Sequence, residues 1–230
     1  MQFGGRLIAW IRDFFKDYLT VRLTLSFVAI IVLFLLFGNI TEDVIEGEKI
    51  VTFDYYVHDQ IDRIRNPVLT QAMTVVTNLG GVYVIGTGTV FIIFLLVALR
   101  QTLWTHFFVW LMGGGAILDK ILKMSIQRVR PPGLRLIAAH GWSYPSGHAM
   151  TSTLFYFALI YFMLDKKWSW SVRLSISVFA FCLVLLISFS RIYLGVHYTS
   201  DVIAGFIGGL LWLVICVIAM EMRKRNKYSR

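Results

Sequence analysis

Long apolar runs separated by short polar or charged segments dominate the chain and predict membrane-spanning helices. A helix needs about 20 mostly apolar residues to cross the hydrocarbon core of a bilayer. The third run is the shortest, and its three consecutive glycines lower helix propensity. The pattern predicts an all-α, polytopic membrane protein with six transmembrane helices, at residues 23–40, 81–98, 104–118, 148–164, 172–189 and 202–220.

The segments outside these runs predict a single membrane-embedded domain, residues 1–230, with no internal repeat. Residues 1–22 form a basic lead in which 7–19 is an amphipathic stretch at the membrane interface, followed by an uncleaved first span. Residues 41–80 form a loop that begins with acidic side chains. Within it, the mixed-charge stretch 54–65 predicts a short surface helix that caps the bundle and is solvated on its charged face. A basic tail, 221–230, closes the chain.

Composition supports the membrane assignment. Hydrophobic residues make up 57% of the chain and charged residues 15%, whereas a globular protein carries about 25% charged residues. These values exclude a soluble domain, a disordered chain and a disulfide scaffold. Cys182 and Cys216 both lie inside apolar runs, which indicates packing residues rather than a disulfide or a metal site.

The net charge of +9 is explained by membrane orientation. With the N-terminus inside, the inner flanks carry 13 basic and four acidic residues, and the outer segments carry nine of each. Positive residues are enriched on cytoplasmic flanks. The distribution therefore predicts a multi-pass protein of the cell (plasma) membrane with both termini cytoplasmic, and it disfavours nucleic-acid binding.

The outer side nevertheless gathers cations in the loops after the third and fifth spans: Lys120, Lys123, Arg128, Arg130, Arg135 and Arg191. A lone cation at a membrane edge usually extends toward lipid headgroups, and that alone explains Arg128 and Arg135. Lys123 and Arg130 are seven residues apart before Pro131. If the third helix extends to this proline, the two cations share one face.

Two further stretches carry polar groups suited to chemistry. Pro145, Ser146 and Gly147 precede His148 at the start of the fourth span, where exposed N–H groups and the helix dipole favour an anion. His197 and Asp201 are four residues apart at the start of the sixth span, a spacing that lets the carboxylate fix the imidazole tautomer. Singly, each feature fits a helix start or a packing residue.

Together, these groups on one outer face predict a phosphoryl-transfer site. Lys123, Arg130 and Arg191 supply charge-assisted hydrogen bonds to a tetrahedral oxyanion. One histidine held by a carboxylate can act as a nucleophile, and the other can protonate the leaving group. The cations neutralise the developing charge, so neither a metal nor another cofactor is required.

The three stretches resemble the motifs of the type 2 phosphatidic acid phosphatase family of membrane lipid phosphatases. The family pattern is Lys-x6-Arg-Pro, Pro-Ser-Gly-His and Ser-Arg-x5-His-x3-Asp, and every defining position is filled, with intervals of 13 and 41 residues. The resemblance implies that His197 is the nucleophile, that Asp201 orients it, and that His148 is the general acid and then the base. It also implies a phosphate-binding set: Lys123, Arg130, Ser146, the Gly147 N–H and Arg191. The roles of Ser190 and Arg128 stay open.

The resemblance implies hydrolysis of a lipid phosphate at the outer interface through a phosphohistidine, with a substrate that enters from the bilayer. Undecaprenyl pyrophosphate is the favoured substrate because an outward site suits a carrier lipid that ends its cycle there. Phosphatidylglycerophosphate and phosphatidate are the alternatives, since the motifs recognise only phosphate. A non-catalytic transporter or anion-binding scaffold is the competing class, but no paired broken helices support it. No obligate protein partner is expected.

Overall fold

The computed structural model describes residues 2–47, 49–165 and 168–228, and all regular structure within these ranges is helical. This confirms the all-α prediction. The helices of the described ranges are α1 (Gln2–Glu46), α2 (Lys49–Ile64), α3 (Pro67–Leu79), α4 (Val82–Ala98), α5 (Thr102–Ile126), α6 (Gly147–Leu164), α7 (Trp170–Tyr193) and α8 (Thr199–Tyr228).

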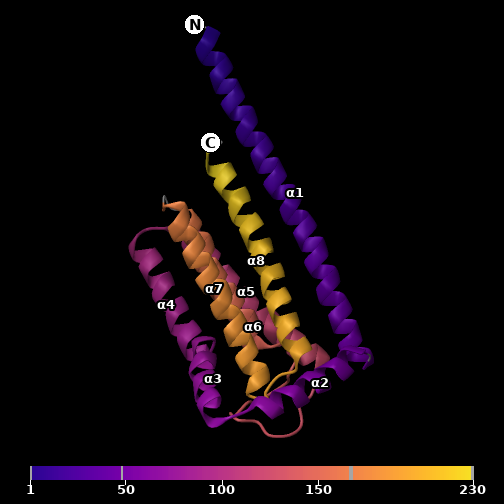
Figure 1. Cartoon of the computed structure of the whole chain (residues 1–230). Coiled ribbons are helices and arrows are strands. Elements are labelled where there is room, and N and C mark those ends of the chain that lie inside the picture. Colours follow the sequence, from indigo (N-terminus) through magenta and orange to yellow (C-terminus); the bar gives the residue numbers. More distant parts are fainter. Residues whose placement is uncertain (1, 48, 166–167, 229–230) are drawn as a thin grey trace.

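The long helices form one elongated bundle, and α2 lies across one of its ends (Figure 1). Helix α8 packs against both α1 and α6, and α6 in turn packs against α7. Both termini lie at the end opposite α2, and the N-terminal part of α1 extends beyond the neighbouring helices (Figure 1). The loop between α5 and α6 and the turn between α7 and α8 lie at the α2 end.

Five helical segments in the described chain are long and apolar enough to cross a membrane. Helix α5 contains the expected third span but is not among them; its apolar run is interrupted by His106 and the Gly113–Gly115 triplet. A total of six spans therefore stays a prediction. The five segments are Thr24–Glu46, Pro67–Ala98, Gly147–Leu164, Trp170–Tyr193 and Thr199–Lys224.

The region 41–80 is more helical than a loop. Helix α1 continues through Glu46, and residues 54–64 lie in α2, as the surface-helix prediction requires. Asn66 then caps α3 by accepting the Leu69 N–H at 2.9 Å. Because α3 and α4 together make one apolar stretch of 32 residues, the second candidate span begins well before the predicted residue 81.

The N-terminal lead shows no break in its backbone. Helix α1 is continuous from Gln2 to Glu46, so stretch 7–19 and the first span belong to one helix. The interfacial position of 7–19 stays a prediction. Some charged residues used for the orientation argument lie outside the described residues: Glu48, Lys166, Lys167 and Arg230.

The predicted extension of the third helix to Pro131 is wrong. Helix α5 ends at Ile126, and Gln127 adopts a left-handed conformation with φ of 49° while its N–H bonds to the Lys123 carbonyl at 3.1 Å. This is a C-terminal helix cap. Lys123 therefore lies in the last turn of α5 and Arg130 in the following loop, so they do not share a helix face.

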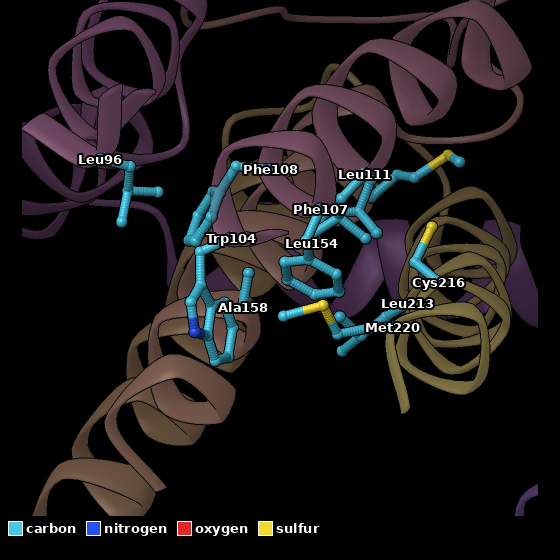
Figure 2. Packing of buried hydrophobic residues seen from close by; sticks show 11 residues of the cluster. Leu96, Trp104, Phe107, Phe108, Leu111, Leu154, Ala158, Leu213, Cys216 and Met220 are labelled. Carbon is cyan, nitrogen blue, oxygen red and sulfur yellow. The ribbon is translucent and has the colours of Figure 1, made fainter. Parts of the chain in front are cut away.

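Three apolar clusters occur among the described residues, and two of them contain most of the buried side chains. The largest joins α4, α5, α6 and α8 and includes the free thiol of Cys216. Figure 2 shows its side chains from α5, α6 and α8 close together, with Leu96 of α4 farther out. Phe108, Leu111 and Leu154 in this cluster are fully buried. The second cluster lies near the α7–α8 turn and contains Tyr193, Leu194, Val196, Ala149 and Val202. It gives this turn a rigid support close to the predicted site.

Candidate active site

The predicted site residues lie at the α2 end of the bundle, where the α5–α6 loop, the α7–α8 turn and the first turns of α6 and α8 meet. Helix α5 supplies Lys123 and the following loop supplies Arg130. The start of α6 supplies Ser146, Gly147 and His148; α7, the turn and α8 supply Arg191, His197 and Asp201. Segments up to 78 residues apart in the sequence therefore contribute to one site.

His197 and Asp201 form a buried pair. The side chain of His197 is buried and that of Asp201 is fully so, and the distance from His197 Nδ1 to Asp201 Oδ2 is 3.4 Å. Ser143 Oγ donates to the same Oδ2 at 2.5 Å and lies 3.4 Å from Nδ1. The Tyr198 N–H also donates to Oδ2, at 2.9 Å. Ser143 was missed from the sequence because a serine in a loop carries no pattern.

Arg130 fixes the tautomer of His197. Its Nη1 atom lies 3.1 Å from His197 Nε2, and a guanidinium can only donate hydrogen bonds. Nε2 is therefore the acceptor, and Nδ1 carries the proton that faces Ser143 and Asp201. The lone pair of Nε2 is directed toward the cationic side of the site. Arg130 also donates to the carbonyls of Val196 at 2.7 Å and Gly141 at 3.0 Å, which ties the two loops together.

The electrostatic environment keeps His197 neutral. Burial lowers the pKa of His197 to about 4; Asp201 opposes this shift, and Arg130 and Arg191 add to it. At neutral pH the imidazole is uncharged, and its Nε2 lone pair accepts the hydrogen bond from Arg130. Both the tautomer and the charge state are those of a nucleophile.

Lys123 lies beside the start of α6. Its Nζ donates to the Pro145 carbonyl at 2.7 Å and forms an ion pair with Asp119, one helical turn earlier. A side chain at Gly147 would come within 3.4 Å of both Lys123 Nζ and the Asp119 carboxylate. Glycine therefore lets the backbone approach this cation. Burial lowers the pKa of Lys123, and Asp119 opposes that shift.

Of the buried polar atoms without a hydrogen-bond partner among the described residues, two belong to predicted site residues: Ser146 Oγ and Arg191 Nε. Arg191 is anchored through Nη1, which donates to Thr77 Oγ1 at 2.7 Å. Ser146 is the residue before α6, and its side chain does not cap the helix. The first N–H groups of a helix have no partner within it. An anion at this position would satisfy these donors.

His148 lies in the first turn of α6, half-buried. Its ionisable neighbours are the cations Arg191, Arg130 and Lys123 and the neutral His197. The second histidine therefore lies near the cations and the first histidine.

Arg128 and Ser190 are occupied by protein contacts. The prediction that Arg128 extends to headgroups is wrong, because its guanidinium donates to Asp201 Oδ1 at 2.6 Å and to Asp54 Oδ2 at 2.8 Å. Asp54 was expected on a solvated surface, yet it is 1% exposed. Ser190 Oγ donates to the carbonyl of Ile187 in its own helix at 2.6 Å.

The α7–α8 turn depends on a glycine. Gly195 has φ of 72°, and a Cβ atom there would lie 2.7 Å from both the Leu134 carbonyl oxygen and Arg65 Nη2. A left-handed conformation is strained for other residues. Gly195 therefore lets the α5–α6 loop pack against the turn that carries His197.

The donor set favours a tetrahedral anion. Three cations, a helix N-terminus and the unpartnered Ser146 hydroxyl are ligands that phosphate oxygens prefer. Within the described parts of the chain, no group of three or more histidine, cysteine, aspartate or glutamate side chains is arranged to hold a metal ion.

Comparisons with known proteins agree with this chemistry. Residues 82–225 match the PAP2 superfamily. The chain is 34% identical to phosphatidylglycerophosphatase B of Bacillus subtilis (strain 168) over 157 residues, which cover 64% of this chain and 73% of the relative. It is 35% identical to an undecaprenyl-diphosphatase of Sulfolobus acidocaldarius over 80 residues, 35% of this chain and 34% of that protein.

Solved structures share the fold. The crystal structure of a transmembrane PAP2-type phosphatidylglycerolphosphate phosphatase from Bacillus subtilis matches with a TM-score of 0.77 and 29% identity, covering 84% of this chain and 96% of that chain. Aquifex aeolicus LpxE matches with a TM-score of 0.54 at 22% identity, over 73% of this chain and 94% of that chain, which shows likeness of fold alone. The chain therefore belongs to the PAP2 superfamily and is a multi-pass membrane lipid phosphatase of that family.

Proposed function

We propose that the protein hydrolyses the terminal phosphate of a lipid phosphate or pyrophosphate without a metal ion, through a phosphohistidine on His197. The observation that carries this proposal is the contact between Arg130 Nη1 and His197 Nε2 at 3.1 Å. It leaves the proton on Nδ1 and directs the Nε2 lone pair toward a cation that also binds phosphate. The nucleophilic nitrogen of His197 therefore lies next to a residue of the proposed phosphate-binding set.

In the first step, Nε2 of His197 attacks the terminal phosphorus, a P–N bond forms and the P–O bond to the leaving group breaks. The leaving group is the lipid phosphate of a pyrophosphate substrate or the lipid alcohol of a monophosphate substrate. His148 gives a proton to the departing oxygen. Lys123, Arg130 and Arg191 neutralise charge on the equatorial oxygens, as preorganised cations do in phosphoryl transfer. Asp201 and Ser143 stabilise the proton on Nδ1 as the ring acquires positive charge.

In the second step, His148 takes a proton from water, and the water attacks phosphorus. The P–N bond breaks, inorganic phosphate leaves and His197 returns to its neutral form. The unpartnered donors Ser146 Oγ and Arg191 Nε hold the phosphate in both steps. All charge compensation comes from side chains, so the reaction is expected to proceed in the presence of EDTA.

The proposed substrate is undecaprenyl pyrophosphate, converted to undecaprenyl phosphate at the extracytoplasmic face of the plasma membrane. Undecaprenyl-diphosphatase relatives from Sulfolobus acidocaldarius and, by a putative name, Escherichia coli support it. Phosphatidylglycerophosphate is the second candidate, because the Bacillus subtilis relative of that name matches over a longer part of the chain. Both substrates present a terminal phosphate on a lipid anchor.

A phosphate-release assay in detergent with EDTA tests the proposal. Four lipids are compared at equal surface fraction: undecaprenyl pyrophosphate, phosphatidylglycerophosphate, phosphatidate and a short-chain prenyl pyrophosphate. We expect the highest kcat/KM with undecaprenyl pyrophosphate and loss of turnover in His197→Ala. A higher kcat/KM for phosphatidylglycerophosphate would select the second candidate. Strict dependence on added Mg²⁺ would contradict the metal-free chemistry.

A further inference from the structure

Arg128 bridges two buried carboxylates, those of Asp54 and Asp201. Its side chain is 11% exposed, and those of Asp54 and Asp201 are fully buried. Nη2 donates to Asp54 Oδ2 at 2.8 Å, and Nη1 donates to Asp201 Oδ1 at 2.6 Å and to Ser200 Oγ at 2.7 Å. The guanidinium also lies 4.1 Å above the ring of Tyr198. Arg128 therefore acts within the protein rather than on a phosphate.

Asp54 reaches the start of α8 from a different helix. Its Oδ1 accepts the Ser200 N–H at 2.8 Å, and its Oδ2 accepts the Ser200 hydroxyl. Ser200 lies in the first turn of α8, next to Asp201. A carboxylate that accepts N–H bonds at a helix start stabilises that end of the helix. Here the cap comes from α2, 146 residues away.

The two contacts of Asp54 control the same catalytic carboxylate. The charge of Arg128 is shared between Asp54 and Asp201, so the negative field of Asp201 at His197 depends on Asp54. The position of the Asp201 backbone depends on Asp54 as well, through the cap on Ser200. Burial lowers the pKa of Arg128, but Asp201 and Asp54 together raise it above its ordinary value. A guanidinium is not deprotonated in proteins, so Arg128 stays charged whether or not Asp54 is present.

We propose that Asp54 of the surface helix α2 is a positioning residue, which acts through Arg128 and Ser200 to hold Asp201 in place for His197. This inference rests on the proposed role of His197. The proposal gives α2 a part in catalysis that the three motifs do not specify. Asp54 precedes all three motifs, and Arg128 occupies one of the unspecified positions of the first.

The test compares Asp54→Asn with a matched control on the same helix, Asp59→Asn. Asp59 is exposed and pairs only with its helical neighbours Gln60 and Arg63 among the described residues. We expect Asp54→Asn to lower kcat by about 10-fold or more, as loss of an outer-shell partner does elsewhere, while KM stays within about 3-fold. Asp59→Asn retains wild-type kcat. Wild-type kcat in Asp54→Asn would overturn the proposal.

Two readouts separate positioning from general loss of structure. Because part of the effect of Asp54 passes through Arg128, the kcat loss in the Asp54→Asn, Arg128→Gln double variant should be smaller than the product of the two single losses. A double-variant loss equal to that product would contradict the route through Arg128. Asp54→Asn should also move the acid limb of kcat/KM down by about half a pH unit, because removing a negative charge disfavours protonated His197. The charged or titratable groups around His197 are Asp201, Arg130, Arg191 and His148. An acid limb of kcat/KM at the same pH in Asp54→Asn as in the wild type would contradict the electrostatic effect of Asp54 on His197.

Ser200→Ala keeps the test decisive if Asp54→Asn does not fold. It removes the hydroxyl that contacts both Asp54 and Arg128 but leaves the backbone cap, and we expect a kcat loss of about 3-fold or more. An unchanged kcat would overturn the proposal. Absence of phosphate release from the wild-type protein would instead refute the proposed function, so the two failures are distinguishable.

Discussion

At the scale of single residues, Ser143 connects the two members of the proposed nucleophilic pair. It is fully buried, and its hydroxyl lies between Asp201 Oδ2 and His197 Nδ1, at 2.5 Å and 3.4 Å. His197 Nδ1 and Asp201 Oδ2 are 3.4 Å apart, so the bridging hydroxyl of Ser143 helps to orient the imidazole relative to the carboxylate. Sequence reasoning identified His197 and Asp201 from their spacing but had no basis for Ser143, which packs against them only after the loop has folded.

Ser143→Ala is expected to lower kcat about 10-fold, because a buried hydrogen bond to a charged group is worth about 1.5–3 kcal/mol. KM should change by less than about 3-fold, since Ser143 lies at Nδ1 of His197 and not at Nε2, the proposed attacking atom. Steady-state phosphate release measures both constants. Ser125→Ala, which removes an exposed hydroxyl on α5 bonded to its own helix, is the matched control. Equal kcat values in the two variants would contradict the bridging role.

The lowered pKa of His197 predicts that kcat/KM declines only at unusually low pH. The nucleophile must be neutral, and its pKa is lowered to about 4, mainly by burial. Activity should therefore persist as the pH falls below 6 and decline only as it approaches about 4. A pH profile of kcat/KM in detergent measures the limb, with intactness of the protein checked by circular dichroism at each pH. An acid limb at the ordinary histidine pKa of about 6.5 would contradict this environment.

At the scale of helices, close packing between α6 and α8 brings two motifs together. A Cβ atom at Gly205 of α8 would lie 2.5 Å from the Ser146 carbonyl oxygen. The Ser146 N–H in turn donates to the Asp201 carbonyl at 2.9 Å. The apolar runs in the sequence predicted both helices, but the pairing of α6 with α8 depends on packing between Ser146 and Gly205, which are 59 residues apart.

Gly205→Ala is expected to destabilise the protein by about 1–3 kcal/mol, because overpacking against a backbone oxygen forces the helices apart. The shift should also lower kcat, since Ser146 and Asp201 move together. Thermal unfolding in detergent measures the stability. Gly113→Ala on α5 is the control, because nothing lies within 4 Å of its Cβ position and alanine favours a helix. Similar melting temperatures in both variants would contradict the role of this contact.

Helix boundaries were predicted less well than the helices themselves. Pro131 suggested the end of α5, but a left-handed Gln127 ends it at Ile126, and left-handed residues other than glycine leave little trace in a sequence. The mixed-charge stretch 54–65 correctly predicted a helix. The prediction that its charged side chains are solvated is wrong for Asp54, which is buried. Its partner Arg128 is 74 residues away, and such long-range ion pairs are not visible in local patterns.

At the scale of the whole molecule, the bundle separates the two termini from the site. Both termini lie at one end, and the α5–α6 loop and α2 lie at the other (Figure 1). Because positive residues are enriched on cytoplasmic flanks, we propose that the termini lie inside and that the site faces the extracytoplasmic leaflet.

Cysteine accessibility tests this orientation. In a Cys182→Ser, Cys216→Ser background, Ala138→Cys in the exposed part of the α5–α6 loop should react with a membrane-impermeant thiol reagent on intact cells. Trp170→Cys, exposed at the opposite end of the bundle, should react only after the cells are permeabilised. Labelling is read by mass shift. The reverse pattern would invert the topology and place the site in the cytoplasm.

The central claim is that the phosphoryl group passes through His197. Its most direct test is alkaline quenching of the enzyme during turnover of a lipid labelled with ³²P in the terminal phosphate, followed by peptide mapping. We predict acid-labile, base-stable label on the peptide containing His197 and none in His197→Ala. In His148→Ala, which lacks the base for the second step, the label that forms should decay more slowly in a chase with unlabelled lipid. Phosphate release by His197→Ala at the wild-type rate, or equal labelling of that variant, would contradict the account.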